Sequence, residues 1–206
     1  MFDYSGSTAL VTGASKGLGA AFAEALAQRG MNLVLVARST DELNVLSKRL
    51  DSKYKIQSTV LSIDLANPSS PHRIAEELER RGIQVDLLVN NAGFGLSGKF
   101  LSHDFKQKQA EVEVNIQALV ALTHHFGKAM AARGKGGIIN VASNASFQPV
   151  PKVEARASMR QRVLSDMCAH ISARSLFCSS PKNVYIFRTN PEYHKALKHP
   201  PAQLLL

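Results

Sequence analysis

The sequence contains no tryptophan and only two cysteines, Cys168 and Cys178, in 206 residues. So few cysteines argue against a disulfide framework, and a reducing compartment is expected. The chain has no run of about 18 apolar residues, so neither a membrane-spanning helix nor a membrane partner is expected. Its first residues, MFDYSGSTALVTG, have no basic segment and no apolar core typical of a secretory signal. The expected location is therefore cytoplasmic.

What the sequence does contain is enough apolar material for one globular domain, because hydrophobic residues make up 45% of the chain. The net charge of +9 raises the question of a nucleic-acid partner. Residues 1–151 carry 16 Lys and Arg against 13 Asp and Glu, whereas residues 152–206 carry 9 against 3. This basic tail has neither interleaved aromatic residues nor a binding motif, so a nucleic-acid partner is not expected. Salt-sensitive binding to nucleic acid would contradict this expectation.

Apolar, β-branched segments alternate with segments of helical spacing through the first three quarters of the chain. Strands are predicted over residues 8–13, 31–38, 56–65, 85–93 and 136–143. Helices are predicted over residues 17–29, 39–50, 69–82 and 105–133. Strands that are apolar throughout are typical of a parallel sheet covered on both faces. We therefore predict an α/β fold, a Rossmann-type doubly wound parallel sheet with the strand order 3-2-1-4-5.

The alternating pattern ends near Pro151. Beyond it, weak patterns predict a helix over 163–177 and a strand over 183–187. We expect residues 1–151 to form the domain, and 152–206 to be a divergent, truncated or irregular tail that is not a separate domain. Without its late strands the sheet would expose an edge, so marginal stability, homo-oligomers or aggregation are expected. A monomer with a sharp, high melting transition would contradict this.

The segment TGASKGLG, residues 12–19, lies between the first predicted strand and the first predicted helix. Its three glycines permit a tight turn and close backbone approach to a pyrophosphate. The N-terminus of the helix adds free N–H groups and the positive end of the helix dipole. Because a strand and a helix flank the loop, it predicts a dinucleotide site. The loop residues predicted to bind the cofactor are Gly13, Ser15, Lys16, Gly17, Leu18 and Gly19.

The same loop resembles the TGxxxGxG signature of the short-chain dehydrogenase/reductase family. Further segments resemble that family's motifs in the same order: DL at 64–65, NNAG at 90–93, VNIQALVALT at 114–123 and GGIINVAS at 136–143. The resemblance covers residues 8–151. It implies an oxidoreductase that moves a hydride between a nicotinamide and a small carbonyl or alcohol substrate.

The resemblance also implies roles for individual residues. The additional residues implied to border the cofactor are Asp64, Leu65, Asn91, Ala92 and Gly93. Ser143 would hydrogen-bond the substrate oxygen, and Asn115 would order a water linked to the family's lysine. Both could instead be inherited polar groups that retain no chemistry. The histidines lack the spacing of a zinc site, so no metal is expected.

Charge at the end of the second predicted strand bears on the choice of cofactor. NAD enzymes place a carboxylate there to bind the ribose hydroxyls. Here the sequence is VARST, with Arg38 in place of an acid and Lys16 in the glycine loop. Two cations suit a 2′-phosphate through charge-assisted hydrogen bonds, which favours NADP(H) over NAD(H). The alternative is that Arg38 is a surface cation with no ligand.

The family's catalytic tyrosine and lysine are missing. Counting from Ser143 places them at positions 156 and 160, where the sequence has Arg156 and Arg160. A guanidinium does not lose its proton in proteins, so Arg156 cannot replace the tyrosine as acid or base. Arg160 could supply the lysine's charge, with a different reach and geometry.

Two functional hypotheses follow from this departure. The first is an NADP(H)-dependent short-chain oxidoreductase, impaired in this chain. The second is a non-catalytic NADP(H)-binding protein, or an inactive frameshifted or truncated product. The abrupt loss of pattern after SFQPVP, residues 146–151, motivates a shifted reading frame, and a genuinely divergent C-terminus is the rival explanation. The DNA sequence from the codon for Ile138 to the stop, read in all three frames, distinguishes the two.

Overall fold

The computed structural model describes residues 4–141 and 184–188. Its strands form one sheet in the order β3-β2-β1-β4-β5-β6. The strands are β1 (Thr8–Thr12), β2 (Asn32–Ala37), β3 (Ser58–Ser62), β4 (Leu87–Asn90), β5 (Gly137–Val141) and β6 (Val184–Arg188). The first five are parallel, which confirms the predicted Rossmann-type sheet and the order 3-2-1-4-5.

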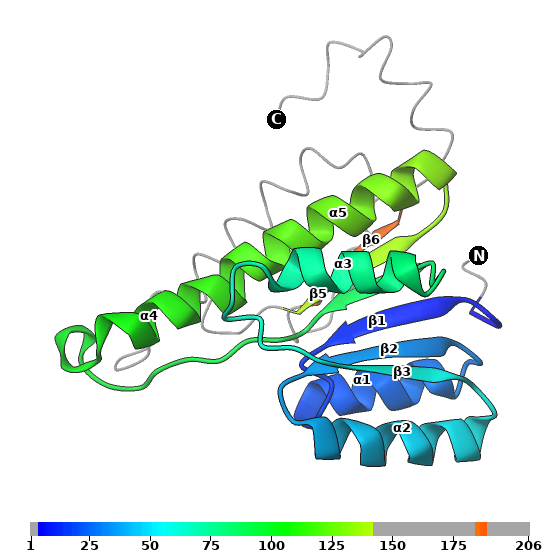
Figure 1. Cartoon of the computed structure of the whole chain (residues 1–206), viewed down its shortest axis with the longest axis horizontal. Coiled ribbons are helices and arrows are strands. Elements are labelled where there is room, and N and C mark those ends of the chain that lie inside the picture. Colours follow the sequence, from blue (N-terminus) through cyan, green and yellow to red (C-terminus); the bar gives the residue numbers. More distant parts are fainter. Residues whose placement is uncertain (1–3, 142–183, 189–206) are drawn as a thin grey trace, which may run out of the picture.

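Helices cover both faces of this sheet (Figure 1). They are α1 (Gly17–Ala27), α2 (Thr40–Tyr54), α3 (Ser70–Arg80), α4 (Phe105–Val112) and α5 (Ala118–Arg133), with a short 3-10 turn η1 (Phe100–Ser102). The pair α1 and α2 lies on one face, and α3 and α5 lie on the other (Figure 1). Within the described ranges, no helix is long and apolar enough to cross a bilayer.

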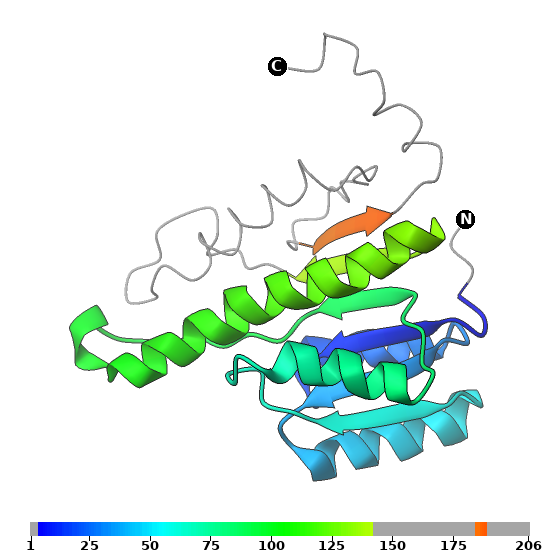
Figure 2. The ribbon, with the colours of Figure 1, turned by 45° about the horizontal axis from the view of Figure 1, so that its top comes forward.

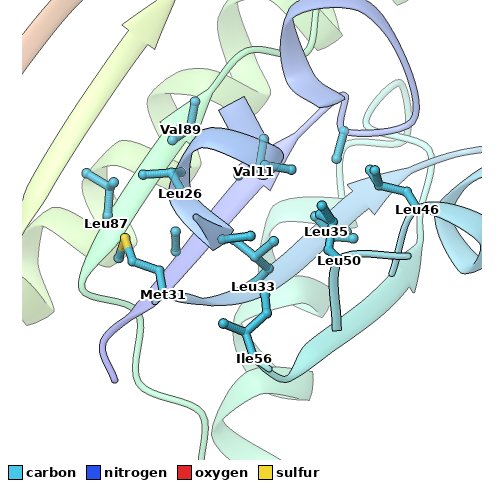
Figure 3. Close-up of a cluster of buried hydrophobic side chains, with 14 of the residues drawn as sticks. Val11, Leu26, Met31, Leu33, Leu35, Leu46, Leu50, Ile56, Leu87 and Val89 are labelled. Atoms are coloured by element: carbon cyan, nitrogen blue, oxygen red, sulfur yellow. The ribbon is translucent and has the colours of Figure 1, made fainter. Parts of the chain in front are cut away.

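The sheet separates two hydrophobic cores. On the side of α1 and α2, Val11 and Leu35 from the strands pack with Leu26, Leu46 and Leu50 from the helices (Figure 3). On the opposite side, a second core joins the strands to α3 and α5. Successive residues of a strand point to opposite faces, so a strand between two cores must be apolar at every position. The continuous apolar runs in the sequence reflect this arrangement.

The long helical region predicted over 105–133 is present, with an interruption. A π-helical segment, η2 (Glu113–Gln117), lies between α4 and α5. In a π-helix the hydrogen bonds run over five residues in place of four, so the segment holds one extra residue relative to an α-helix. The residue composition gave no signal for it. The interruption places Val114 and Asn115 in the interior.

The strand predicted over residues 183–187 is confirmed as β6 (Val184–Arg188). β6 pairs antiparallel with β5 over five residues (Figure 2). Among the described strands, β6 is the edge strand on this side of the sheet, so the expectation of an exposed edge stays a prediction. The helix predicted over 163–177 lies outside the described residues.

A charged cluster on the surface joins α1 to α2. Three side chains of α2 donate hydrogen bonds of 2.9–3.0 Å to the Glu24 carboxylate: Lys53, Arg49 and Tyr54. These contacts lower the pKa of Glu24 from 4.5 to about 2, with the bond from Lys53 as the largest cause. A carboxyl whose pKa is lowered on folding stabilises the fold above its unfolded pKa, and loses that contribution as pH falls.

The Glu24→Gln variant tests this contribution. Between pH 4.5 and about 2, the wild type should lose more free energy of unfolding than the variant, because only the wild type must protonate Glu24. Urea unfolding at each pH measures the difference, which should shrink at 1 M salt because the cluster is exposed. Glu79→Gln is the control, since Glu79 is an exposed carboxylate that lies outside the ion pairs of the described residues. Parallel pH curves for Glu24→Gln and the wild type would contradict the prediction.

Candidate functional site

A cleft of about 480 Å³ opens at the carboxyl ends of the parallel strands. It lies beside β1 and β4, where the chain stops adding strands toward β3 and begins adding them toward β5. At this switch point the loops leaving neighbouring strands diverge, which creates a crevice in doubly wound sheets. Ten residues predicted to bind the cofactor line the cleft: Gly13, Ser15, Lys16, Leu18, Arg38, Asp64, Leu65, Asn91, Ala92 and Gly93.

The other two predicted glycines, Gly17 and Gly19, shape the loop without lining the cleft. Gly17 has φ of +59°, a conformation that costs side-chain-bearing residues energy. A Cβ on Gly19 would overlap the carbonyl oxygen of Gly13. A Cβ on Gly13 itself would lie 2.9 Å from Cα of Ala92. The glycines thus allow the loop after β1 to pack against the segment after β4.

Thr12, at the end of β1, joins these two segments by hydrogen bonds. Its hydroxyl donates to the carbonyl of Val89 at 3.2 Å and accepts from the backbone N–H groups of Asn91 and Ala92 at 3.0 Å. The Asn91 amide donates back to the carbonyls of Thr12 at 2.9 Å and of Gly13 at 3.2 Å. Thr12 is 1% exposed, and its bond to Val89 is fully buried, whereas the bonds with Asn91 and Ala92 are partly buried. They fix one wall of the cleft.

A second buried network lies between β4, β5 and α5. The Asn90 amide donates to the Thr123 hydroxyl at 2.9 Å and to Oδ1 of Asn140 at 2.8 Å. All three side chains are buried. Buried amides need such partners because an unpaired one costs the full desolvation of the group. The network holds β4 against β5 just beneath the cleft.

At the end of the cleft beside β2 and β3, the lining is charged and open. Lys16 and Arg38 are exposed cations. Asp64 is the one carboxylate that lines the cleft within the described chain, and its Oδ1 accepts the N–H of Ala66 at 3.0 Å. Cations therefore outnumber acids here, which favours an anionic ligand.

The end of the cleft beside β5 is apolar except for Asn115. This side chain is 3% exposed, and its amide donates to the carbonyl of Phe94 at 2.7 Å. The η2 segment brings Asn115 and Val114 to the cleft, where Phe94 and Val141 complete the lining. The bond from Asn115 fixes the loop that follows β4.

The remaining predicted catalytic positions, Ser143, Arg156 and Arg160, lie outside the described residues. Sequence reasoning missed several residues that line the cleft: Val36, Ala37, Ser39, Ile63, Phe94, Val114 and Val141. Most of them stand at or just after the ends of strands, which is the signal that could have identified them. Within residues 4–141 and 184–188, no group of three His, Cys, Asp or Glu side chains could hold a metal.

Comparison with known proteins identifies the family. The family model described as short chain dehydrogenase matches residues 7–160. This chain therefore belongs to the short-chain dehydrogenase family, a class of oxidoreductases. The match extends through both positions where arginine replaces the expected residues.

Individual relatives agree with this assignment. Very-long-chain 3-oxoacyl-CoA reductase-B from Danio rerio is 33% identical over 159 residues, which cover 75% of this chain and 50% of that protein. The structure of L-sorbose reductase from Gluconobacter frateurii complexed with NADPH and L-sorbose has a TM-score of 0.72 at 31% identity, over 79% of this chain and 62% of that one. A short-chain dehydrogenase from Sphingobium yanoikuyae in complex with NADPH has a TM-score of 0.72 at 32% identity, over 77% of this chain and 62% of that one. The chain spans about half the length of the curated relatives it matches.

The Thr12→Val variant tests the wall between the two loops. It keeps the shape of the side chain but removes the hydroxyl, and with it three hydrogen bonds between β1 and the segment from Val89 to Ala92. We expect a loss of about 1–3 kcal/mol in the free energy of unfolding, because each lost hydrogen bond contributes about 0.5–1.5 kcal/mol net. Urea denaturation measures it. Thr59→Val in β3 is the matched control, and equal losses in the two variants would contradict the prediction.

Proposed function

We propose that this chain is an NADP(H)-dependent oxidoreductase of the short-chain type, with its turnover impaired by the residues at positions 156 and 160. When bound, the cofactor supplies the hydride that passes between its nicotinamide and a carbonyl or alcohol carbon. The observation that carries the choice of cofactor is the exposed Lys16–Arg38 pair at a cleft whose second strand ends without a carboxylate.

The residues of the cleft fit a dinucleotide. Gly17 leaves open space where a Cβ would stand, next to the N-terminus of α1. No side chain caps that terminus, so its first N–H groups are available to a pyrophosphate. We assign the adenine side to Asp64 and Leu65, and the nicotinamide side to the segment Asn91–Gly93. The NADPH complexes of two similar proteins support a nicotinamide cofactor for this cleft.

The preference for NADP(H) over NAD(H) follows from charge. A 2′-phosphate between Lys16 and Arg38 would receive charge-assisted hydrogen bonds from both. The ribose hydroxyls of NAD(H) would lack the carboxylate that normally accepts from them. The N-terminus of α2 adds a positive dipole end beside Arg38.

Catalysis is the part of the function that this chain performs poorly. We assign Ser143 to bind the substrate oxygen and Asn115 to order water near the reacting groups. Asn115 also holds the carbonyl of Phe94, which keeps the loop beside the nicotinamide side in place. Arg156 cannot deliver a proton at neutral pH, so the step that needs an acid or base has no efficient donor.

The first test is cofactor binding by the full chain. We expect NADPH to bind more tightly than NADH in a calorimetric titration. Arg38→Ala should lower the ratio of the NADH to the NADPH dissociation constant by about tenfold or more, since a hydrogen bond to a charged group contributes about 1.5–3 kcal/mol. Arg73→Ala, which removes an exposed cation of α3, is the control. Tighter binding of NADH by the wild type would overturn the choice of cofactor.

The second test is turnover. We expect slow NADPH oxidation across a panel of ketones and aldehydes, and a faster rate in the double variant Arg156→Tyr, Arg160→Lys. General acid–base catalysis contributes about 10²–10⁴-fold, which sets the upper range of the gain. Ser143→Ala should abolish the gained activity, and Arg162→Tyr is the control for a tyrosine placed nearby. A wild type as fast as the double variant would show that these arginines do not impair it.

A further inference from the structure

We propose that Ser62 is a positioning residue that sets the preference for a cofactor bearing a 2′-phosphate, by fixing the backbone at Arg38. This inference rests on the proposed NADP(H) binding. Ser62 is the last residue of β3, and the turn between β2 and α2 passes beside it. Ser62 itself does not line the cleft, so any effect on the cofactor must pass through Arg38.

Two hydrogen bonds place the Ser62 hydroxyl between β2 and α2. Its Oγ donates to the backbone carbonyl of Arg38 at 3.0 Å. The same Oγ accepts the hydroxyl of Thr40 at 2.7 Å. The Ser62 hydroxyl therefore both donates and accepts a hydrogen bond. Through these two bonds, one side chain of the neighbouring strand β3 holds the turn Arg38–Thr40 at each end.

The bond to the Arg38 carbonyl orients the peptide that joins Arg38 to Ser39. In a trans peptide the C=O and N–H point in opposite directions. With the carbonyl held toward Ser62, the N–H of Ser39 points away from Ser62. Both Arg38 and Ser39 line the cleft. Rotation of this peptide would redirect the Ser39 N–H and shift the base of the Arg38 side chain.

The position of Arg38 matters because two acids stand close by. Asp41 and Glu42 occupy the first turn of α2 and are exposed. Carboxylates stabilise a helix N-terminus but repel a phosphate that approaches it. A 2′-phosphate is therefore favoured only where the Arg38 guanidinium lies closer to it than the carboxylates of Asp41 and Glu42. The Ser62 hydroxyl keeps the turn in the one arrangement that the structure shows.

The strand itself supplies a matched control. Ser58, the first residue of β3, is also a serine whose hydroxyl bonds to α2, donating to Oδ1 of Asp51 at 2.5 Å. It lies at the opposite end of the strand from the cleft. Ser58→Ala and Ser62→Ala therefore remove the same chemical group from the same strand, one far from the cleft and one beside it.

The experiment measures the dissociation constants of NADPH and NADH for the full-length wild type, Ser62→Ala, Ser62→Thr and Ser58→Ala, together with their melting temperatures. In Ser62→Ala we expect the preference for NADPH over NADH to fall by about three- to tenfold, the contribution of one exposed hydrogen bond. The affinity for NADH should change less than twofold. Ser62→Thr keeps the hydroxyl on a residue suited to strands and should restore the preference. Ser58→Ala should leave it unchanged.

The outcomes separate this inference from the function it rests on. A wild type without preference for NADPH would overturn both. A wild type that prefers NADPH, with the same preference in Ser62→Ala, would overturn the role of Ser62 alone. An equal weakening of NADPH and NADH in Ser62→Ala would show a general structural effect, and so would a Ser58→Ala variant that loses as much preference as Ser62→Ala.

Discussion

The loop after β1 packs against the segment after β4 with no space for a side chain between them. A Cβ at Gly19 would overlap the Gly13 carbonyl, and one at Gly13 would press on the backbone of Ala92. Thr12 and Asn91 then bind the two segments together with buried and partly buried hydrogen bonds. The cleft exists because this contact forms one wall, while the turns after β2 and β3 form the other.

Much of this arrangement could be predicted from the sequence, for a physical reason. Strands covered on both faces must be apolar throughout, and helices of such a sheet must carry one apolar side, so the alternation of the two patterns predicts a covered parallel sheet. The order 3-2-1-4-5 followed from the Rossmann-type arrangement. The glycine loop was predictable because its flanking strand and helix could be recognised. Lys16 and Arg38 were found from the glycine loop and from the end of the second strand, and Asp64 from the resemblance to the family. All three line the cleft because strand ends of a parallel sheet meet at one edge.

What the sequence did not reveal are contacts between polar groups distant in the chain. Nothing in the letters around Ser62 distinguishes it from Ser58, although one hydroxyl meets the turn beside the cleft and the other meets Asp51. The triple use of the Thr12 hydroxyl depends on the register of β1 and β4. The pairing of β6 with β5 was also beyond reach, because a short apolar strand carries no information about direction.

The π-helical segment η2 constrains the length of the chain between α4 and α5. Each residue turns a helix by about 100°, so the extra residue in η2 rotates everything after it relative to everything before. Leu119, Leu122 and Phe126 face the sheet only because of that added rotation, and Asn115 reaches the cleft for the same reason. Loss of a single residue here would turn the apolar side of α5 toward water and its polar side toward β4 and β5. Exposed loops elsewhere in the fold tolerate changes of length. In η2, by contrast, the number of residues sets the rotation of α5 relative to α4, so the deletion of one residue would misplace the apolar side of α5.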